Sequence, residues 1–257
     1  MAKYVMNHLE QLQENLQGRK ISLFLDYDGT LAPIVGRPEK AELPLFMRDT
    51  LRSLAHRYPV AVISGRSLKD LKERINLDKI VYAGNHGIEI WSKDFKLEMV
   101  DISIVETLKR ITDELEDSLA HINGVLIENK RLTASVHYRI ADLMDVKPAM
   151  RIVKTAVSPY IEKRIFVLRE GKKVLEIRPN IRWNKGNAVE WILGKNGFKN
   201  TMPIYIGDDE TDRDAFNVLK GKGISVGVGY QWQDSDSDAD YFLKTQAEVK
   251  RFLEWLN

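Results

Sequence analysis

Two aspartates stand two residues apart directly after a short apolar run. They belong to the segment Asp26-Tyr27-Asp28-Gly29-Thr30-Leu31, which follows the apolar residues 21–25. Parallel α/β sheets bind ligands outside the carboxyl ends of their strands, so a strand here would present both carboxylates to a ligand. One carboxylate could attack a substrate while the other transfers a proton. The structural alternative is an Asp-Gly turn after an edge strand.

A second acidic group follows another apolar run. Residues 204–206 are Ile-Tyr-Ile, and the chain continues as Gly207-Asp208-Asp209-Glu210-Thr211-Asp212. Carboxylates crowded in this way repel one another unless a cation lies among them. Oxygen ligands near a phosphate suit Mg²⁺, so the aspartates are candidate metal ligands. Part of the cluster could instead cap the next helix.

Two further residues at the ends of expected elements could bind a phosphate. Ser64 follows the apolar run 60–63, and its hydroxyl, with the N-terminus of the next helix, suits a phosphate oxygen. A simple helix cap is the equal alternative for Ser64. Lys185 would open a helix, where a cation opposes the helix dipole unless an anion binds nearby. A solvated lysine is the alternative there.

Short apolar strands alternate with helices at both ends of the chain. The expected strands are 21–25, 60–63, 80–83, 204–206 and 224–226, and the expected helices are 3–17, 43–57, 67–75, 185–195, 211–219 and 245–256. This alternation is typical of a parallel sheet that is buried on both faces. We therefore expect an α/β fold with a Rossmann-like core, formed by residues 1–100 and 181–257.

Residues 101–180 have a different pattern. A long helix to about residue 121 precedes strands at 124–128 and 132–139, then a helix over 142–158 that ends around Pro159, then strands at 166–169 and 173–178. A β-β-α-β-β order is typical of an α+β domain. We expect an inserted cap domain that excludes water and contacts the substrate.

Composition limits the class of protein. The chain has 257 residues and a net charge of +2, which gives no electrostatic argument for binding nucleic acid or an anionic membrane. It has no cysteine, which excludes disulfides and thiolate metal sites. With no apolar run of ~18 residues and no signal core in residues 1–17, a cytoplasmic location is the default expectation. The acidic loop 234–240 is interpreted as solvated, with calcium binding as the alternative.

The four chemical segments occur in the order of the motifs of haloacid dehalogenase-like phosphatases. Within that superfamily, the chain resembles the trehalose-6-phosphate phosphatase family over roughly residues 20–245. The resemblance lies in the segments 25–35, Ser64-Gly65-Arg66, Gly84-Asn85-His86-Gly87, Glu128-Asn129-Lys130, 135–139, 175–179, Asn184-Lys185-Gly186 and 207–212. One departure is Arg213, where the family usually has an acid; the resemblance places this position outside the catalytic groups.

The resemblance implies a Mg²⁺-dependent phosphatase that hydrolyses trehalose 6-phosphate, in trehalose biosynthesis, through an aspartyl-phosphate intermediate. It implies Asp26 as the nucleophile and Asp28 as the acid and base, assisted by Ser64 and Lys185. The implied Mg²⁺ residues are Asp26, the backbone carbonyl of Asp28, and Asp208, with Asp209 and Asp212 behind them. The implied substrate-binding residues are Gly29, Thr30, Gly65, Arg66, Asn85, His86, Glu128, Lys130, His137, Arg139, Lys172 and Glu176.

Other functions stay open at this point. The enzyme could act on sucrose 6-phosphate or on a glucosyl- or mannosyl-phosphoglycerate. The chain could also be a non-catalytic domain that senses sugar phosphates, although the presence of all the expected catalytic groups argues against it. The expected partner is a small sugar phosphate, and a trehalose-6-phosphate synthase is a candidate protein partner; neither nucleic acid nor a membrane is expected.

Overall fold

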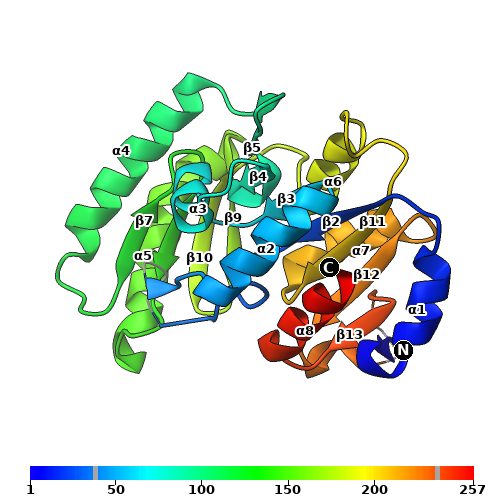
Figure 1. Ribbon diagram of the computed structural model, residues 1–257. Helices are drawn as coiled ribbons and strands as arrows, with labels where there is room; N and C mark the ends of the chain where they lie inside the picture. Colours follow the sequence, from blue (N-terminus) through cyan, green and yellow to red (C-terminus); the bar gives the residue numbers. More distant parts are fainter. Residues whose placement is uncertain (37–39, 235–237) are drawn as a thin grey trace. The chain divides into compact units, whose positions relative to one another are not determined.

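The computed structural model describes residues 1–36, 40–234 and 238–257, which divide into two compact units (Figure 1). The first unit consists of Met1–Leu97 and Trp183–Asn257, and the second of Glu98–Arg182. Residues 235–237 of the acidic loop lie outside the described residues, so neither interpretation of that loop is tested. Every helix in the described ranges is too short or too polar to span a lipid bilayer.

A nine-stranded sheet forms the centre of the first unit. Its order is β1-β13-β12-β11-β2-β3-β4-β5-β6. The bounds are β1 Lys3–Tyr4, β2 Ile21–Leu25, β3 Val60–Ile63, β4 Ile80–Gly84, β5 Glu89–Trp91, β6 Lys96–Glu98, β11 Met202–Gly207, β12 Ile224–Val228 and β13 Tyr241–Leu243. The strands from β1 to β4 in this order pair in parallel, and β5 pairs antiparallel with β4. After β2 the chain continues to β3, which lies on one side of β2 in the sheet, whereas β11 lies on the other side of β2. The strand order therefore reverses at β2. Ligands bind at such a reversal in open α/β sheets.

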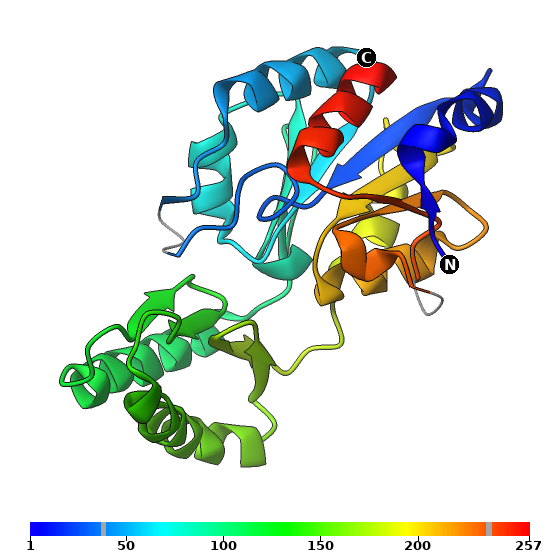
Figure 2. The same ribbon diagram turned by 90° about the horizontal axis from the view of Figure 1, so that it is seen from below.

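Helices cover both faces of this sheet (Figure 2). They are α1 Leu9–Leu16, α2 Leu45–Arg57, α3 Leu68–Ile75, α6 Lys185–Leu193, α7 Arg213–Leu219 and α8 Gln246–Leu256. Leu23 and Leu25 of β2 pack in one apolar core with α1, α2, α3 and α8, whereas Phe24 packs in a second core with α6 and α7. Because side chains alternate along a strand, β2 is fixed from both sides, and its last residue leads directly to the site.

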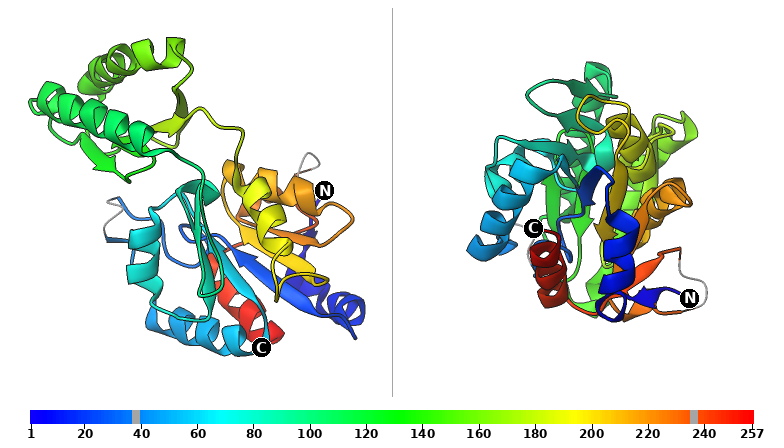
Figure 3. Two further views of the ribbon diagram at one scale, coloured as in Figure 1. Left: turned by 90° about the horizontal axis from the view of Figure 1, so that it is seen from above. Right: turned by 45° about the vertical axis from the view of Figure 1, so that its right-hand side comes forward.

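The second unit is a four-stranded antiparallel sheet with two helices on one face (Figure 3). Its elements are α4 Ile102–Leu119, β7 Leu126–Asn129, β8 Ala134–His137, α5 Leu143–Glu162, β9 Phe166–Gly171 and β10 Val174–Pro179. The sheet order is β7-β8-β10-β9. One apolar core joins both helices to the sheet, so the opposite face of the sheet is left to carry polar side chains.

The structure corrects two expected helix boundaries. The N-terminal helix begins at Leu9 instead of residue 3, because Lys3–Tyr4 pairs in parallel with β13 and the Tyr4 hydroxyl donates to Glu248 at 2.7 Å. Helix α5 continues through Pro159 to Glu162. Proline removes a backbone hydrogen bond, but the Tyr160 ring packs 6.2 Å from that of Phe166, and this packing favours the last turn. The three-residue strands β5, β6 and β13 were not among the strands expected from the sequence.

Candidate active site

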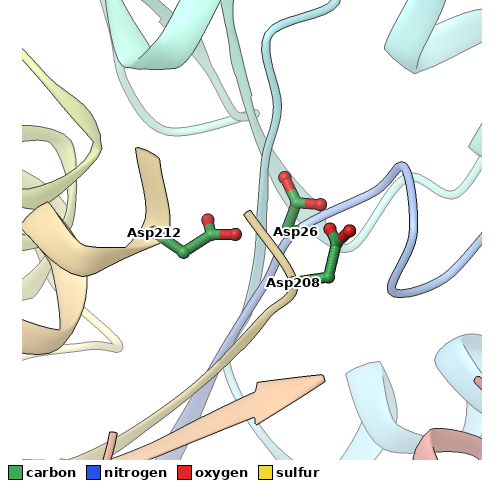
Figure 4. Close-up of side chains that lie close together, drawn as sticks. All are labelled: Asp26, Asp208 and Asp212. Atoms are coloured by element: carbon green, nitrogen blue, oxygen red, sulfur yellow. The ribbon is translucent and has the colours of Figure 1, made fainter. Parts of the chain in front are cut away.

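Three carboxylates converge at the carboxyl end of β2 (Figure 4). Asp26 directly follows β2, while Asp208 and Asp212 follow β11, which pairs with β2 through Ile206 and Leu25. One oxygen of each aspartate lies within 4.8 Å of the other two. Asp26 and Asp212 are buried and Asp208 is half-buried. Parallel pairing of β2 and β11 thus joins two acidic segments that are far apart in the sequence.

A buried lysine lies between two of these carboxylates. The Lys185 Nζ atom is 2.7 Å from Asp26 Oδ1 and 2.6 Å from Asp212 Oδ1, and the lysine is only 3% exposed. Lys185 is the first residue of α6, which Asn184 caps by accepting from Asn187 N at 3.0 Å. The unfavourable position of this cation in the helix dipole, noted from the sequence, is therefore offset by two carboxylates.

Burial and crowding change the ionisation of the cluster. Burial raises the pKa of Asp26 well above its usual range, against the opposing effect of Lys185, and Asp212 raises it further. Burial and the charge of Asp212 raise the pKa of Asp208 to about 7. Burial alone would lower the pKa of Lys185, but the adjacent Asp212 and Asp26 raise it above its usual range. The site thus holds three carboxyl groups and one lysine, and the crowding of the acids favours protonation of Asp26 and Asp208 while no cation is bound.

The cluster fits a hard divalent cation. Within the described residues, the Oδ1 atom of Asp208 is buried without a hydrogen-bond partner. The donors are all oxygen atoms, which Mg²⁺ and Ca²⁺ prefer. Gly29 lies beside Asp208 with φ of +85°, and a Cβ atom there would be 2.1 Å from Asp208 Oδ2. Only glycine therefore allows the Asp28-Gly29 turn to approach Asp208 this closely.

Two hydroxyls expected to bind phosphate are buried near the ends of β2 and β3. The Thr30 Oγ1 atom has no hydrogen-bond partner in the part of the chain that the structure describes. Ser64, 1% exposed, accepts the backbone N–H of Arg66 at 3.2 Å. Ser67, and not Ser64, caps α3 by accepting from Asp70 N at 3.2 Å.

The segment after β4 is joined to the segment after β3 by backbone hydrogen bonds. Asn85 N donates to Arg66 O at 2.7 Å, and His86 N donates to Ser64 O at 2.8 Å. The Asn85 amide nitrogen also donates to the buried Glu89 at 2.7 Å. A Cβ atom at Gly65 would be 2.7 Å from the His86 ring. Gly65, Asn85 and His86 thus form one tightly packed edge of the site.

Asp28 has a different environment from the other carboxylates. Its Oδ2 and Oδ1 atoms accept from Arg66 Nε and Nη2, each at 2.7 Å. The third nitrogen, Arg66 Nη1, donates to Asp70 at 2.7 Å. The family resemblance implied that Arg66 binds substrate, and in the structure all three of its guanidinium nitrogens donate to carboxylates. Burial by itself raises the pKa of Asp70, but hydrogen bonds from Arg74 and Arg66 bring it below its usual range.

Asp209 is separate from the three convergent carboxylates. Its side chain is exposed and accepts from Glu210 N at 2.7 Å, which caps a short 3₁₀ helix over Glu210–Asp212. Its backbone N–H donates to Asp212 Oδ2 at 2.9 Å. Asp209 therefore orients Asp212 through its backbone, and capping accounts for its carboxylate.

The second unit gathers four of the six polar residues expected there. Lys130, 8% exposed, lies 3.9 Å from Glu128 and 4.0 Å from Glu176, and His137 Nε2 is 3.0 Å from Glu128 Oε2. Glu128 and Glu176 both pair with Ser135 of β8 from the neighbouring strands, which puts them on one face. The other two form a separate pair, in which Arg139 donates to Lys172 O at 3.1 Å.

Several residues of these networks were not identified from the sequence. The Tyr205 hydroxyl donates to Asp212 at 2.7 Å, Arg178 pairs with Glu176, and Asp70 binds Arg66. The signal for Tyr205 was a polar aromatic residue within an apolar strand. The signal for Asp70 was its position four residues after Arg66 at the start of a helix, where such pairs meet.

Comparisons with known proteins give evidence of the protein's family that does not depend on the geometry of the site. A family model described as trehalose-phosphatase matches residues 24–247. "Trehalose-phosphate phosphatase B" of Arabidopsis thaliana is 34% identical over 264 residues, covering 98% of this chain and 70% of that protein. The C-terminal domain of a C. albicans trehalose-6-phosphate phosphatase has a similar fold, with a TM-score of 0.81 at 21% identity over 100% and 98% of the two chains. A haloacid dehalogenase-like hydrolase from Bacteroides thetaiotaomicron gives a TM-score of 0.65 at 16% identity, over 93% and 100%.

Proposed function

Since the chain belongs to the trehalose-phosphatase family and is a phosphoric monoester hydrolase, we propose that it hydrolyses trehalose 6-phosphate to trehalose and inorganic phosphate. The observation that carries this proposal is the buried Asp26 at the sheet reversal, held by Lys185 beside Asp208 and Asp212. A carboxylate that is oriented by a lysine and faces a cation site is suited to attack a phosphate ester.

In the proposed reaction, an oxygen of Asp26 forms a bond to phosphorus while the bond to the sugar O6 breaks. Asp28 gives a proton to the departing O6, because an alkoxide is a poor leaving group. A water molecule then attacks the aspartyl-phosphate, Asp28 accepts the proton of that water, and phosphate leaves. Asp26 is regenerated, so protons and electrons balance over the cycle.

The chain supplies groups to hold the phosphate oxygens during this transfer. Lys185 Nζ is already beside the attacking carboxylate at 2.7 Å, and the Thr30 hydroxyl is buried with no partner among the described residues. Together with Ser64 and the N–H groups of the Gly29-Thr30 turn, they would donate to oxygens that gain charge in the transition state. Donors fixed before the reaction need no reorganisation as it proceeds.

Mg²⁺ fits the site and would be held by Asp26, Asp208 and the backbone carbonyl of Asp28, with Asp212 and Tyr205 behind. When bound, it would neutralise charge and so reduce the repulsion between the phosphate and Asp26. Asp212 would keep Lys185 in place, because it binds the same ammonium group at 2.6 Å. Asp209 would contribute through the N–H that it donates to Asp212.

In this proposal residues 98–182 form the cap domain and read the sugar, while residues 1–97 and 183–257 perform the chemistry. Glu128, Lys130, His137 and Glu176 form a charged group on one face of the small sheet, and such groups bind hydroxyls by paired hydrogen bonds. Arg139 and Lys172 would add further contacts. Trehalose carries many hydroxyls and no charge, which suits this set.

A panel of phosphate esters tests the substrate. Phosphate release should be fastest with trehalose 6-phosphate, and Glu128→Ala should lower kcat/KM for that substrate by roughly 10- to 150-fold, since a lost hydrogen bond to a charged group costs about 1.5–3 kcal/mol. Hydrolysis of p-nitrophenyl phosphate, which has no sugar to bind, should change little. The panel includes sucrose 6-phosphate and glucosyl- and mannosyl-phosphoglycerate.

The matched control is Glu170→Ala, an exposed acid on β9 of the same sheet, which should leave both activities unchanged. If one of the other esters is hydrolysed with a higher kcat/KM, that ester, and not trehalose 6-phosphate, is the substrate. Absence of any phosphatase activity in the folded, Mg²⁺-supplied protein would support a sensing domain instead.

Metal binding should depend on pH. The raised pKa of Asp208, about 7, means that the folded, metal-free protein holds a proton that the unfolded chain has already lost above about pH 4. Protonated Asp208 therefore contributes to the free energy of unfolding at low pH. This contribution is full below about pH 4 and is lost as the pH rises through 7. Mg²⁺ must displace this proton, so its affinity should increase by at least about tenfold per pH unit below 7.

Thermal melts with and without Mg²⁺ at pH 5.5, 6.5 and 7.5 measure this effect, and the Mg²⁺-induced rise in Tm should be greatest at pH 7.5. Asp208→Asn should remove both the rise and its pH dependence. The exposed Asp113→Asn is the control and should behave as the unaltered protein. An equal rise in Tm at all three pH values would show that Asp208 is not a ligand.

A further inference from the structure

Arg66 is bound so completely by carboxylates that a contact with substrate does not explain it. Its side chain is 6% exposed, and its Nε, Nη1 and Nη2 atoms all donate to Asp28 or Asp70 at 2.7 Å. The guanidinium carbon also lies 5.2 Å from the centre of the buried Tyr27 ring. A guanidinium in contact with two acids and an aromatic face has little freedom to turn toward a ligand.

The contact with Asp28 fixes the direction of that carboxylate. A planar guanidinium fork binds both carboxylate oxygens in one plane, which a point charge cannot do. The Asp28 side chain is 38% exposed, whereas the Arg66 side chain is buried. Arg66 is therefore the rigid member of the pair. An otherwise mobile acid at the edge of the site is thereby held in one orientation.

A chain of alternating charges holds Arg66 itself. Asp70 Oδ2 accepts from Arg66, and both Asp70 oxygens accept from Arg74 Nε at 2.8 and 2.9 Å. Arg74 Nη1 donates to Ala41 O at 2.9 Å, and the Tyr27 hydroxyl donates to the same oxygen at 3.3 Å. The network thus returns to Tyr27, the residue between the two aspartates.

We propose that Arg66 and Asp70 are positioning residues, which hold Asp28 where it can pass a proton to the leaving oxygen. This inference rests on the proposed function only in taking Asp28 as the proton donor. Asp70 touches no reacting atom; it acts through Arg66. Partners that orient metal ligands commonly contribute about 10- to 100-fold to activity, and we expect a contribution of the same order from residues that orient a catalytic acid.

Leaving-group dependence provides a test that general damage would not imitate. The value of kcat/KM reports the steps up to departure of the leaving group, and p-nitrophenolate departs without a proton whereas a sugar alkoxide needs one. Asp70→Asn and Arg66→Lys should therefore lower kcat/KM for trehalose 6-phosphate by about 10- to 100-fold. Each should lower kcat/KM for p-nitrophenyl phosphate by less than about threefold. Arg66→Lys keeps the charge but removes the fork, so it remains informative if Asp70→Asn folds poorly.

Asp28→Asn is the reference variant, and Glu73→Gln, an exposed acid on the same helix α3, is the control. Asp70→Asn should add almost nothing in the Asp28→Asn background, because its effect passes through Asp28. If Asp28→Asn itself shows no leaving-group dependence, the acid role of Asp28 is wrong. If Asp28→Asn shows it while Asp70→Asn and Arg66→Lys do not, or lose both substrates equally, the positioning role is wrong.

Discussion

Asp26→Asn should remove phosphatase activity almost completely, with a decrease in kcat on the order of 10⁴-fold or more, the scale seen when an enzyme loses its nucleophile. The amide is nearly isosteric with the carboxylate but cannot form the bond to phosphorus. The loss should be equally large for trehalose 6-phosphate and p-nitrophenyl phosphate, since both esters transfer phosphate to the same oxygen. This distinguishes Asp26 from Asp28, whose replacement should affect the sugar ester more.

The measurements are phosphate release at saturating Mg²⁺ and inhibition by beryllofluoride. Beryllofluoride bound to an aspartate mimics an aspartyl-phosphate, so this inhibition should disappear in the variant. Asp49→Asn, an exposed acid that pairs with Arg52 on α2, is the control and should be fully active. Residual activity within about tenfold of the unaltered protein would mean that water, and not Asp26, attacks phosphorus.

The parallel core could be anticipated because its evidence is local. β2 and β3 are short, mostly apolar segments, and a candidate functional residue follows each of them at the carboxyl end. Parallel strands align these ends at one edge, so the sequence alone predicts that Asp26, Ser64 and Asp208 lie in one site. The family resemblance added the cap residues, of which Lys130 is buried between Glu128 and Glu176.

The partner of each charged group could not be anticipated, because it depends on side-chain direction and on packing. Arg66 follows Ser64 in a phosphate-binding motif, yet its guanidinium turns to Asp28 and Asp70. Lys185 was expected to need an anion, and two carboxylates from distant segments supply that charge. The acids at Asp208–Asp212 looked alike in the sequence, but local capping leaves Asp209 exposed.

Lys185→Met should produce the largest loss of stability among single changes at the site. Removing the ammonium group leaves Asp26 and Asp212 buried, close together and without their shared cation, and breaking a buried pair in this way costs about 3–5 kcal/mol. The loss should appear as a lower urea midpoint in EDTA. Activity should also fall by about 10²- to 10³-fold, since a donor to the transferred phosphate is lost.

Lys199→Met provides the matched control, because Lys199 is exposed and should contribute little to the free energy of unfolding. The double variant Lys185→Met with Asp212→Asn should be more stable than Lys185→Met alone, since it removes one of the two uncompensated charges. Both variants should remain nearly inactive, which separates the stabilising role of the lysine from its part in phosphate transfer. If Lys185→Met unfolds at the same urea concentration as Lys199→Met, the ammonium group is not what offsets the charge of Asp26 and Asp212.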